Sequence, residues 1–233
     1  MTAMSDPTPD PRDRLVLSLD LDSLAAARAL ARRVAPWFGI AKVGYELYAE
    51  AGPAAFDALH DDGYQVFADL KLFDIPTTVE RGARAIGRHG VEFLNFHAVG
   101  GVPMLRAGVT GLVDGARDAG HATPVALAVT VLTSEPDASA VGERLQFAHD
   151  AGCGGVVCAA SEAAAARALS LAPMVPGIRL RGGDTHDQVR IATPADALQA
   201  GAAWIILGRA VTAADDPETA AARVSDEVAA TLA

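Results

Sequence analysis

Eight short apolar runs alternate with alanine-rich stretches of helical composition, and this alternation constrains the fold more than any other feature of the sequence. The runs are apolar at successive positions, which is typical of strands buried on both faces of a parallel sheet. They cover residues 15–20, 40–44, 65–71, 93–98, 124–132, 154–160, 174–179 and 204–210. Dividing 233 residues by eight gives about 29 residues per strand–helix unit, and the total approaches the ~250 residues typical of a (β/α)8 barrel.

The predicted fold is therefore a single-domain α/β protein, a (β/α)8 TIM barrel over residues 14–233. Residues 1–13 are rich in proline and acidic side chains and lack the apolar core of a signal peptide, so we expect a flexible leader there. A doubly wound open sheet is the structural alternative. Such sheets usually have fewer strands, and the first strand–helix turn here lacks the glycine fingerprint of that fold.

The composition argues against several classes of protein. A formal net charge of −10 disfavours a general nucleic-acid binder, which should present a basic surface. No apolar run approaches the roughly 20 residues that span a bilayer. The only two cysteines, Cys153 and Cys158, lie in or beside an apolar run, which predicts buried thiols, and the six histidines show no metal-ligand spacing. We therefore expect a cytoplasmic protein with no metal, nucleic-acid or membrane partner.

Lysine is scarce in this sequence and is placed where chemistry is expected. The chain has 17 arginines but only two lysines, Lys42 and Lys71, and both fall near the ends of predicted strands, where such barrels carry their active sites. Asp69 and Lys71 are two residues apart and should point to the same side, which Lys42 can also approach, and Asp74 follows in the next loop. Such groups shift one another's pKa values, which predicts a catalytic array; an ion-pair network that only holds the barrel mouth is the alternative.

Two arginines, Arg179 and Arg209, end the last two predicted strands, where this fold commonly binds phosphate. Their guanidinium groups can fork onto phosphate oxygens, and Gly208 lets a backbone N–H approach an anion. Gln188 can add a neutral donor, and the polar, glycine-containing segment 180–186 is expected to be a lid. A solvated surface position is the alternative for each arginine alone. Together the residues predict a phosphate ester held by arginines, with a lysine acid and carboxylates at its reacting end.

A series of short motifs runs along nearly the whole chain from Leu15. They are LDLD at 19–22, KVG at 42–44, DLKLFDIPTT at 69–78, NFHAVGG at 95–101, VTVLTS at 129–134, VPGIR at 175–179, DQVR at 187–190 and LGRAVT at 207–212. In combination and order they resemble the orotidine 5'-phosphate decarboxylase family. The resemblance implies decarboxylation of orotidine 5'-monophosphate to UMP and CO2, the last step of de novo UMP synthesis, by a homodimeric barrel with no cofactor and no metal.

The resemblance also implies a role for each motif residue. Lys71 would protonate C6 of the pyrimidine as CO2 leaves, and Asp69 would sit beside the substrate carboxylate. Lys42 would hold the array in place, and Asp74 would reach across the dimer to complete a Lys-Asp-Lys-Asp array. The implied substrate-binding residues are Asp20, Lys42, Asp69, Thr78, Thr133, Arg179, Gln188, Gly208 and Arg209.

Two other readings of the sequence remain open. A related barrel enzyme, 3-keto-L-gulonate 6-phosphate decarboxylase, shares the D-x-K-x-x-D pattern but uses Mg²⁺ to stabilise an enediolate. The continuation DIPTT at 74–78 and VLTS at 131–134 favour the nucleotide enzyme. A barrel that binds a phosphorylated ligand without turning it over is the second reading, and the complete array of lysines and aspartates argues against it.

Overall fold

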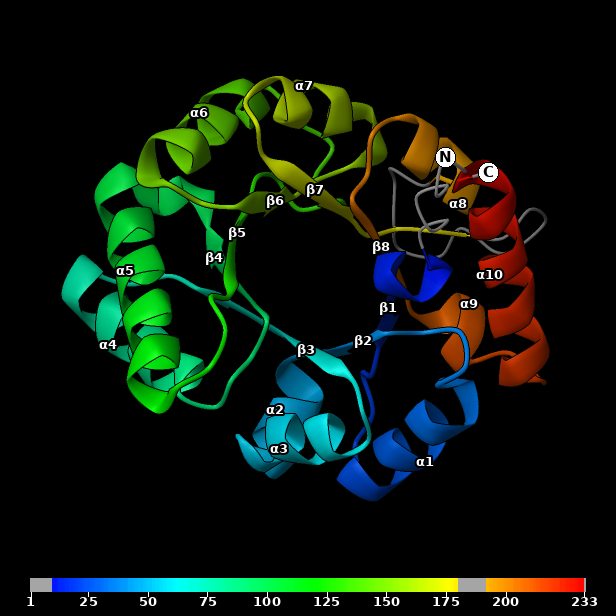
Figure 1. Cartoon of the computed structure of the whole chain (residues 1–233). Coiled ribbons are helices and arrows are strands. Elements are labelled where there is room, and N and C mark those ends of the chain that lie inside the picture. Colours follow the sequence, from blue (N-terminus) through cyan, green and yellow to red (C-terminus); the bar gives the residue numbers. More distant parts are fainter. Residues whose placement is uncertain (1–9, 180–191, 233) are drawn as a thin grey trace, which may run out of the picture.

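Eight parallel strands close into a barrel in sequence order, which confirms the predicted fold class (Figure 1). The structure is a computed structural model that describes residues 10–179 and 192–232. The strands are β1 (Leu15–Ser18), β2 (Ile40–Val43), β3 (Gln65–Leu72), β4 (Phe93–His97), β5 (Val125–Val129), β6 (Gly155–Val157), β7 (Ala172–Val175) and β8 (Trp204–Leu207). Since β8 also pairs with β1, the sheet has no open edge, and each predicted apolar run overlaps one strand.

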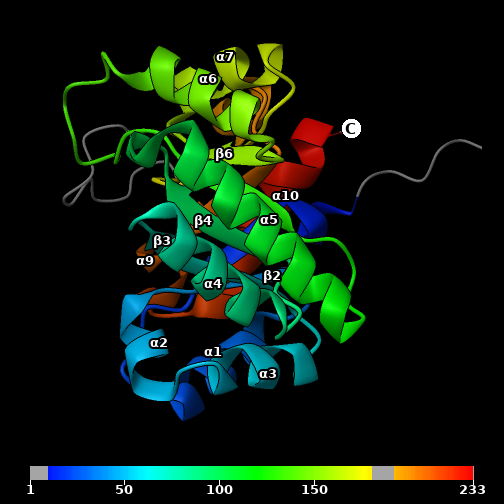
Figure 2. The same cartoon turned by 90° about the vertical axis from the view of Figure 1, so that its left-hand side faces the viewer.

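Helices surround the barrel and follow every strand, as the alternation predicts (Figure 2). The α-helices are α1 (Leu24–Val34), α2 (Tyr45–Ala51), α3 (Ala54–Asp61), α4 (Pro76–Gly87), α5 (Gly101–Ala119), α6 (Val141–Ala151), α7 (Ala163–Ala168), α8 (Pro194–Gln199), α9 (Arg209–Thr212) and α10 (Pro217–Leu232). The 3-10 helices are η1 (Pro11–Arg14), η2 (Ala98–Gly100) and η3 (Ala160–Glu162). In the described part of the chain, no helix is long and apolar enough to cross a membrane.

The first described residues pack against the barrel. The carbonyl of Arg12, within η1, accepts a hydrogen bond from the N–H of Gly39, and the Arg14 guanidinium donates to the carbonyl of Ala203. Residues 11–13, which the sequence analysis assigns to the leader, thus form part of η1. Proline and acidic composition suggested a leader, but the same residues start a capped 3-10 turn, in which Asp10 accepts from the N–H of Arg12.

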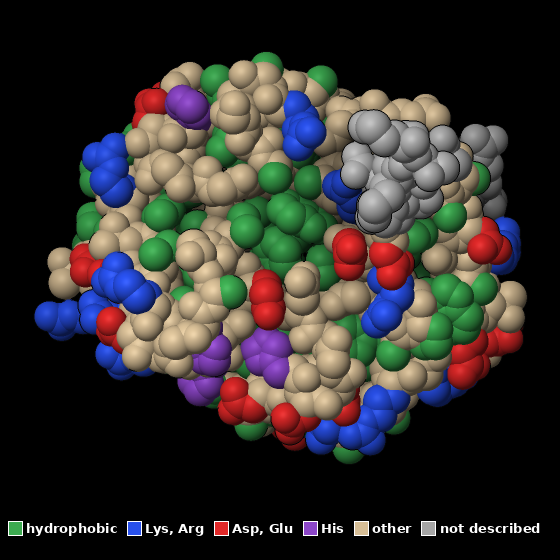
Figure 3. Space-filling model, in the orientation of Figure 1, with side chains coloured by type: hydrophobic (Ala, Val, Ile, Leu, Met, Phe, Trp, Pro, Cys, Tyr) green, Lys and Arg blue, Asp and Glu red, His purple; other side chains and the backbone are tan. Residues whose placement is uncertain are grey.

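The interior of the barrel is filled with apolar side chains to which all eight strands contribute. These are Val16, Ile40, Phe67, Phe93, Leu127, Val129, Val157, Met174 and Ile206. A larger apolar layer lies between the strands and the surrounding helices. At the end where the strands begin, apolar side chains occupy the middle of the face and charged side chains of both signs surround them (Figure 3). Most of the polar residues predicted for the site instead line a pocket at the opposite end.

Strand β3 is irregular at the point where it enters the site. Ala68 pairs with Leu94 and Leu72 with Phe96, so the β3 segment between these pairs is two residues longer than the β4 segment it faces. Lys71 lies in this bulge with a φ of +44°, in the left-handed region. Strict alternation, from which the sequence analysis predicts a common side for Asp69 and Lys71, is therefore interrupted. Both side chains nevertheless line the same pocket. A β-bulge changes the direction in which a strand residue points, and bulges are common next to active sites.

Candidate active site

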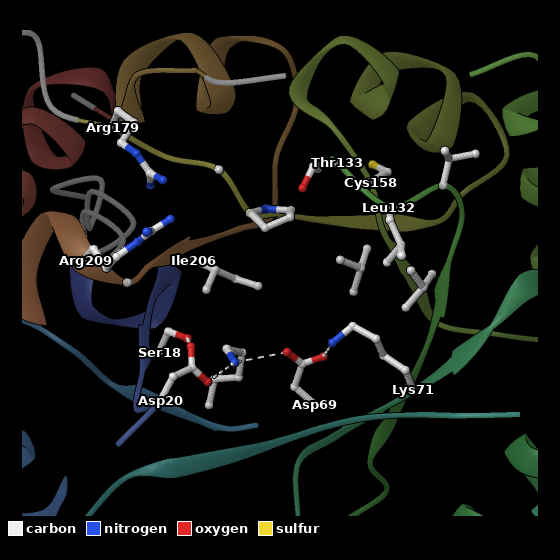
Figure 4. Close-up of a pocket in the computed structure, with 17 residues that line it drawn as sticks. Ser18, Asp20, Asp69, Lys71, Leu132, Thr133, Cys158, Arg179, Ile206 and Arg209 are labelled. Carbon is white, nitrogen blue, oxygen red and sulfur yellow. Dashed lines mark hydrogen bonds and ion pairs between the residues drawn. The ribbon is translucent and has the colours of Figure 1, made fainter. Parts of the chain in front are cut away.

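A pocket of about 540 Å³ opens at the carboxyl ends of the strands, the end where barrels of this fold carry their sites (Figure 4). The lining includes most of the residues that the sequence singled out. It consists of Ser18, Asp20, Lys42, Asp69, Lys71, Val129, Val131, Leu132, Thr133, Val157, Cys158, Pro176, Gly177, Arg179, Ile206, Gly208 and Arg209. Seven of the eight strands or the segments directly after them supply these residues, so only the closed barrel assembles them.

A continuous array of alternating charges forms one wall of the pocket. The Nζ of Lys42 lies 3.0 Å from Asp20 Oδ1 and 3.0 Å from Asp69 Oδ2, and the Nζ of Lys71 lies 2.5 Å from Asp69 Oδ1. Ser18 extends the array by donating to Asp20 Oδ2. Asp69 is therefore held between two ammonium groups, and the catalytic role that the sequence analysis gives this array stays a prediction.

Burial makes the central part of this array strongly coupled. The side chain of Lys42 is only 8% exposed and that of Asp69 only 13%. Burial alone would raise the pKa of Asp69, but Lys42 and Lys71 outweigh it and lower that pKa to about 2. Burial would likewise lower the pKa of Lys42, yet the carboxylates of Asp69 and Asp20 hold it above its ordinary value. Both groups therefore stay charged over the whole physiological range of pH.

Two arginines face this array across the pocket. In Figure 4 the side chains of Arg179 and Arg209 point toward one another on the side of the pocket away from Lys71. Arg179 follows β7 by four residues, because the chain leaves the sheet at Pro176 and turns at Gly177, whose φ is +77°. Arg209 is the first residue of α9, directly after Gly208. The pocket thus has one end suited to an anion and another that carries a mixed-charge array.

Apolar side chains line the pocket between its two charged ends. They include Val129, Val157 and Ile206, which belong to the barrel interior, and Leu132, which is 44% exposed. Thr133 contributes a hydroxyl on the same side as Leu132. Such a lining suits a flat, uncharged ring that lies between the two charged ends of the pocket.

Some of the predicted site residues either do not line the pocket or lie outside the described residues. Asp74 is exposed between β3 and α4, and its carboxylate accepts from the N–H of Ile75; no ion pair joins it to the array among the described residues of the single chain. Thr78 is exposed in the first turn of α4. Gln188 and segment 180–186 lie outside the described residues.

The sequence analysis gave no role to two residues that touch the array, although one of them, Asn95, opens the motif at 95–101. Asn95 on β4 is fully buried and hydrogen-bonds both Asp69 and Lys71. Tyr45 donates to the carbonyl of Leu70, and its ring centroid lies 5.6 Å from the Nζ of Lys71. An asparagine inside the apolar run FLNFH was a usable signal, because a buried amide needs partners.

The two cysteines agree with the predicted burial, but one of them also lies at the pocket. Both cysteines are buried, as predicted, and burial raises the pKa of the Cys153 thiol to about 12. Cys158 also lines the pocket, which the sequence did not indicate.

His97 is half-buried with its ring edge-on to Phe73, and burial together with Lys71 lowers its pKa. Among the described residues, no group of three or more His, Cys, Asp or Glu side chains is placed to hold a metal ion.

The fold and the pocket together define a class, namely a (β/α)8-barrel protein whose pocket combines a pair of arginines with a lysine–aspartate array. Sequence comparison gives the family. The profile of the "Orotidine 5'-phosphate decarboxylase / HUMPS family" matches residues 13–224. The chain belongs to this family.

Named relatives specify the comparison further. The orotidine 5'-phosphate decarboxylase of Moorella thermoacetica is 40% identical, with 93% of this chain and 92% of the relative covered. That of Anaeromyxobacter sp. is 43% identical, with 92% and 98% covered. The crystal structure of orotidine 5'-phosphate decarboxylase from Lactobacillus acidophilus superposes with a TM-score of 0.78 at 33% identity, covering 93% of this chain and 99% of that chain.

Proposed function

We propose that this protein decarboxylates orotidine 5'-monophosphate to UMP and CO2, with no metal or cofactor, as the last step of de novo pyrimidine synthesis in the cytoplasm. One observation carries the proposal. The Lys42–Asp69–Lys71 array and the pair Arg179 and Arg209 line the same pocket from opposite sides. The relatives that carry this name, at 40–43% identity over more than nine-tenths of the chain, support the choice of substrate.

The substrate binds by its two ends. The phosphate dianion lies between Arg179 and Arg209, since guanidinium groups bind phosphate oxygens in pairs. The pyrimidine lies against the apolar lining with Thr133 at its polar edge, and the ribose hydroxyls face Asp20 and Lys42. Binding energy from the remote phosphate thereby positions the reacting ring.

The chemical step moves one pair of electrons and one proton. The bond between C6 and the carboxylate breaks, CO2 leaves, and the electron pair stays on C6 as a carbanion. The Lys71 ammonium stabilises that charge and then donates its proton to C6, which gives UMP. Asp69 holds the Lys71 Nζ at 2.5 Å, and its own pKa of about 2 keeps it from competing as the acid. Solvent then reprotonates Lys71.

The charges around Asp69 support a reaction without a divalent metal. Oδ1 is engaged by Lys71 and by Asn95, and Oδ2 is engaged by Lys42. A divalent cation at this carboxylate would meet two ammonium groups within about 3 Å of the same oxygens, which opposes its binding. The array therefore supplies the positive charge that Mg²⁺ supplies in the alternative sugar-phosphate reaction.

A homodimer completes the proposed site. Asp74 stands between Phe73 and Ile75, whose side chains are 60% and 66% exposed, and Tyr45 and Val99 on neighbouring elements are also more than half exposed. Large exposed apolar side chains close together indicate a contact surface. We propose that a second copy of the chain covers them and that Asp74 enters the partner's pocket beside Lys71.

The test is metal-free turnover. Purified protein in EDTA is given orotidine 5'-monophosphate, and the ultraviolet absorbance is followed as orotate becomes uracil. We expect rapid loss of the orotate signal, and a loss of at least roughly 100-fold in kcat for Lys71→Ala, the size typical of a general acid. Activity of the folded wild type only after magnesium addition, and only with the keto-gulonate substrate, would select the sugar-phosphate enzyme. Binding of UMP without any turnover would indicate a binding-only barrel.

A further inference from the structure

Asn95 is a buried amide with both of its functional atoms committed to the array. It lies on β4 and is fully inaccessible to solvent. Its Oδ1 accepts from the backbone N–H of Lys71 at 2.7 Å, and its Nδ2 donates to Asp69 Oδ1 at 2.7 Å. No other residue in the described part of the chain is recorded as hydrogen-bonding to both the backbone of Lys71 and the carboxylate of Asp69.

Lys71 needs such a support because its backbone is strained. Its φ of +44° places a long side chain in the left-handed region, which is unfavourable for every residue except glycine. The surrounding bulge removes regular pairing with β4 between Ala68 and Leu72. The N–H of Lys71 is therefore free from the ordinary ladder, and the Asn95 side chain takes the place of a strand partner.

We propose that Asn95 is a positioning residue for the decarboxylation. Its side chain holds the Lys71 backbone in the bulged conformation and, through a second hydrogen bond, also fixes the position of Asp69 Oδ1. The inference rests on the proposed function. The two hydrogen bonds fix the position of the Lys71 Nζ relative to the Asp69 carboxylate. They thereby also set the distance between the Lys71 Nζ and C6, to which Lys71 donates its proton. Asn95 does not line the pocket, so it acts through these two residues and not on the substrate.

Two substitutions separate the two halves of this role. Asn95→Leu has a similar size but can neither accept from Lys71 nor donate to Asp69. Asn95→Asp can still accept the N–H of Lys71 but places a second carboxylate against Asp69 in place of a donor. Thr130→Val is the matched control, because Thr130 is equally buried at the end of β5 and its hydroxyl bonds the carbonyl of Val157 and the carboxylate of Glu162 away from the array.

We expect Asn95→Leu to lower kcat by about 100-fold, as misplacement of a catalytic group by an ångström does, while the Kd for UMP changes less than about threefold. UMP lacks the C6 carboxylate of the substrate and takes no proton from Lys71. The Kd for UMP therefore reports whether the parts of the pocket other than the array are intact. Asn95→Asp should lower kcat as well and move the acidic limb of the kcat profile to higher pH. Thr130→Val should keep kcat within about threefold of the wild type.

A second readout does not depend on activity. Without the Asn95 donor, the Asp69 carboxylate loses one of the groups that stabilise its charge, so acid unfolding of Asn95→Leu should begin at higher pH than that of the wild type. If wild type shows no turnover but this shift is present, the proposed function fails, and with it the positioning role in catalysis; only the structural support of Asp69 by Asn95 remains. If wild type turns over substrate and Asn95→Leu keeps its kcat, or loses no more than Thr130→Val, the positioning role is overturned. Should Asn95→Leu not fold, Asn95→Ser takes its place, because its hydroxyl can accept and donate only at shorter reach. Its kcat must then fall further than that of Thr130→Val, and a kcat within about threefold of the wild type would overturn the positioning role.

Discussion

Gly44 shows how tightly single residues are matched to the array. A Cβ at this position would lie 2.5 Å from Asp20 Oδ1 and 3.1 Å from the Nζ of Lys42. Its φ is not in the glycine-favouring region, so the requirement comes from the close approach alone. The KVG motif is thus explained physically, because the glycine leaves room for the salt bridge that the lysine two residues earlier forms.

We therefore predict that Gly44→Ala displaces Asp20 and Lys42. Its kcat/KM should fall by roughly tenfold or more, and its free energy of unfolding by about 1–3 kcal/mol. Gly142→Ala is the control, because no atom lies within 4 Å of a Cβ built in α6 at that position. That variant should keep full activity and gain up to about 1 kcal/mol of stability. Steady-state kinetics and urea unfolding measure both, and an unchanged kcat/KM for Gly44→Ala would contradict the explanation.

The charge of Asp69 predicts a pH dependence of stability. Its pKa is about 2 in the folded protein and about 3.9 in an unfolded chain, so the ionised group stabilises the fold above about pH 4. That stabilisation is lost as the pH falls from about 4 to about 2, and it is on the order of 2 kcal/mol. Urea unfolding at pH 7, 5, 4 and 3 measures it. Asp69→Asn should lack this part of the acid-induced loss, and an identical pH dependence in both proteins would rule out the assignment.

At the scale of elements, α4 and α5 pack with their backbones in close contact. Cβ atoms at Gly111 and Gly115 of α5 would lie 2.1 Å and 2.2 Å from the carbonyl oxygens of Glu80 and Arg84 on α4. The two helices can approach only because these positions have no side chain. This contact also places α4, whose first turn follows the exposed Asp74 segment.

We predict that Gly115→Ala forces the two helices apart and lowers the free energy of unfolding by about 1–3 kcal/mol. For a domain of this size that corresponds to a fall in Tm of roughly 2–4 °C per kcal/mol. Because Gly115 lies near the end of α5 that is remote from the pocket, kcat/KM should stay within about twofold. Calorimetry and kinetics on the same sample test this, and a Tm equal to that of wild type would refute the close-packing explanation.

The elements themselves were largely predictable from the sequence. Strands buried on both faces leave continuous apolar runs, so all eight were found, with their order. Several strands end before the predicted runs do, and two differences bear on the site. β7 ends at Val175 and not at Arg179, since the chain turns at Gly177 with a φ of +77°, and β3 carries a bulge at Lys71. A bulge leaves no clear mark in a sequence, because it is decided by pairing with the neighbouring strand.

At the scale of the whole molecule, the proposed sharing of Asp74 has a quantitative consequence. If each site uses Lys71 of one subunit and Asp74 of the other, a hybrid of Lys71→Ala and Asp74→Ala chains has one intact site and one doubly defective site. Random exchange makes half of the dimers hybrids, so co-refolded equal amounts should regain about one quarter of wild-type activity. Each variant refolded alone should stay inactive.

The oligomeric state must be measured on the same samples, by sedimentation or light scattering. Dimers that form without any recovery of activity would place Asp74 in the site of its own chain. A monomeric protein with full activity would remove the need for a partner subunit, and the exposed Phe73 and Ile75 side chains would then need another explanation.

The sequence by itself determined the fold class, the end of the barrel that holds the site, and most of the charged residues in it. Those features follow from local patterns, namely apolar runs, strand ends and the placement of only two lysines. The tertiary structure alone decided which atoms meet. The pairing of Lys42 with both Asp20 and Asp69 and the support of Lys71 by Asn95 depend on side chains that closure of the barrel brings together from different strands. Contacts between distant segments are set by packing in three dimensions, which residue spacing along the chain does not encode.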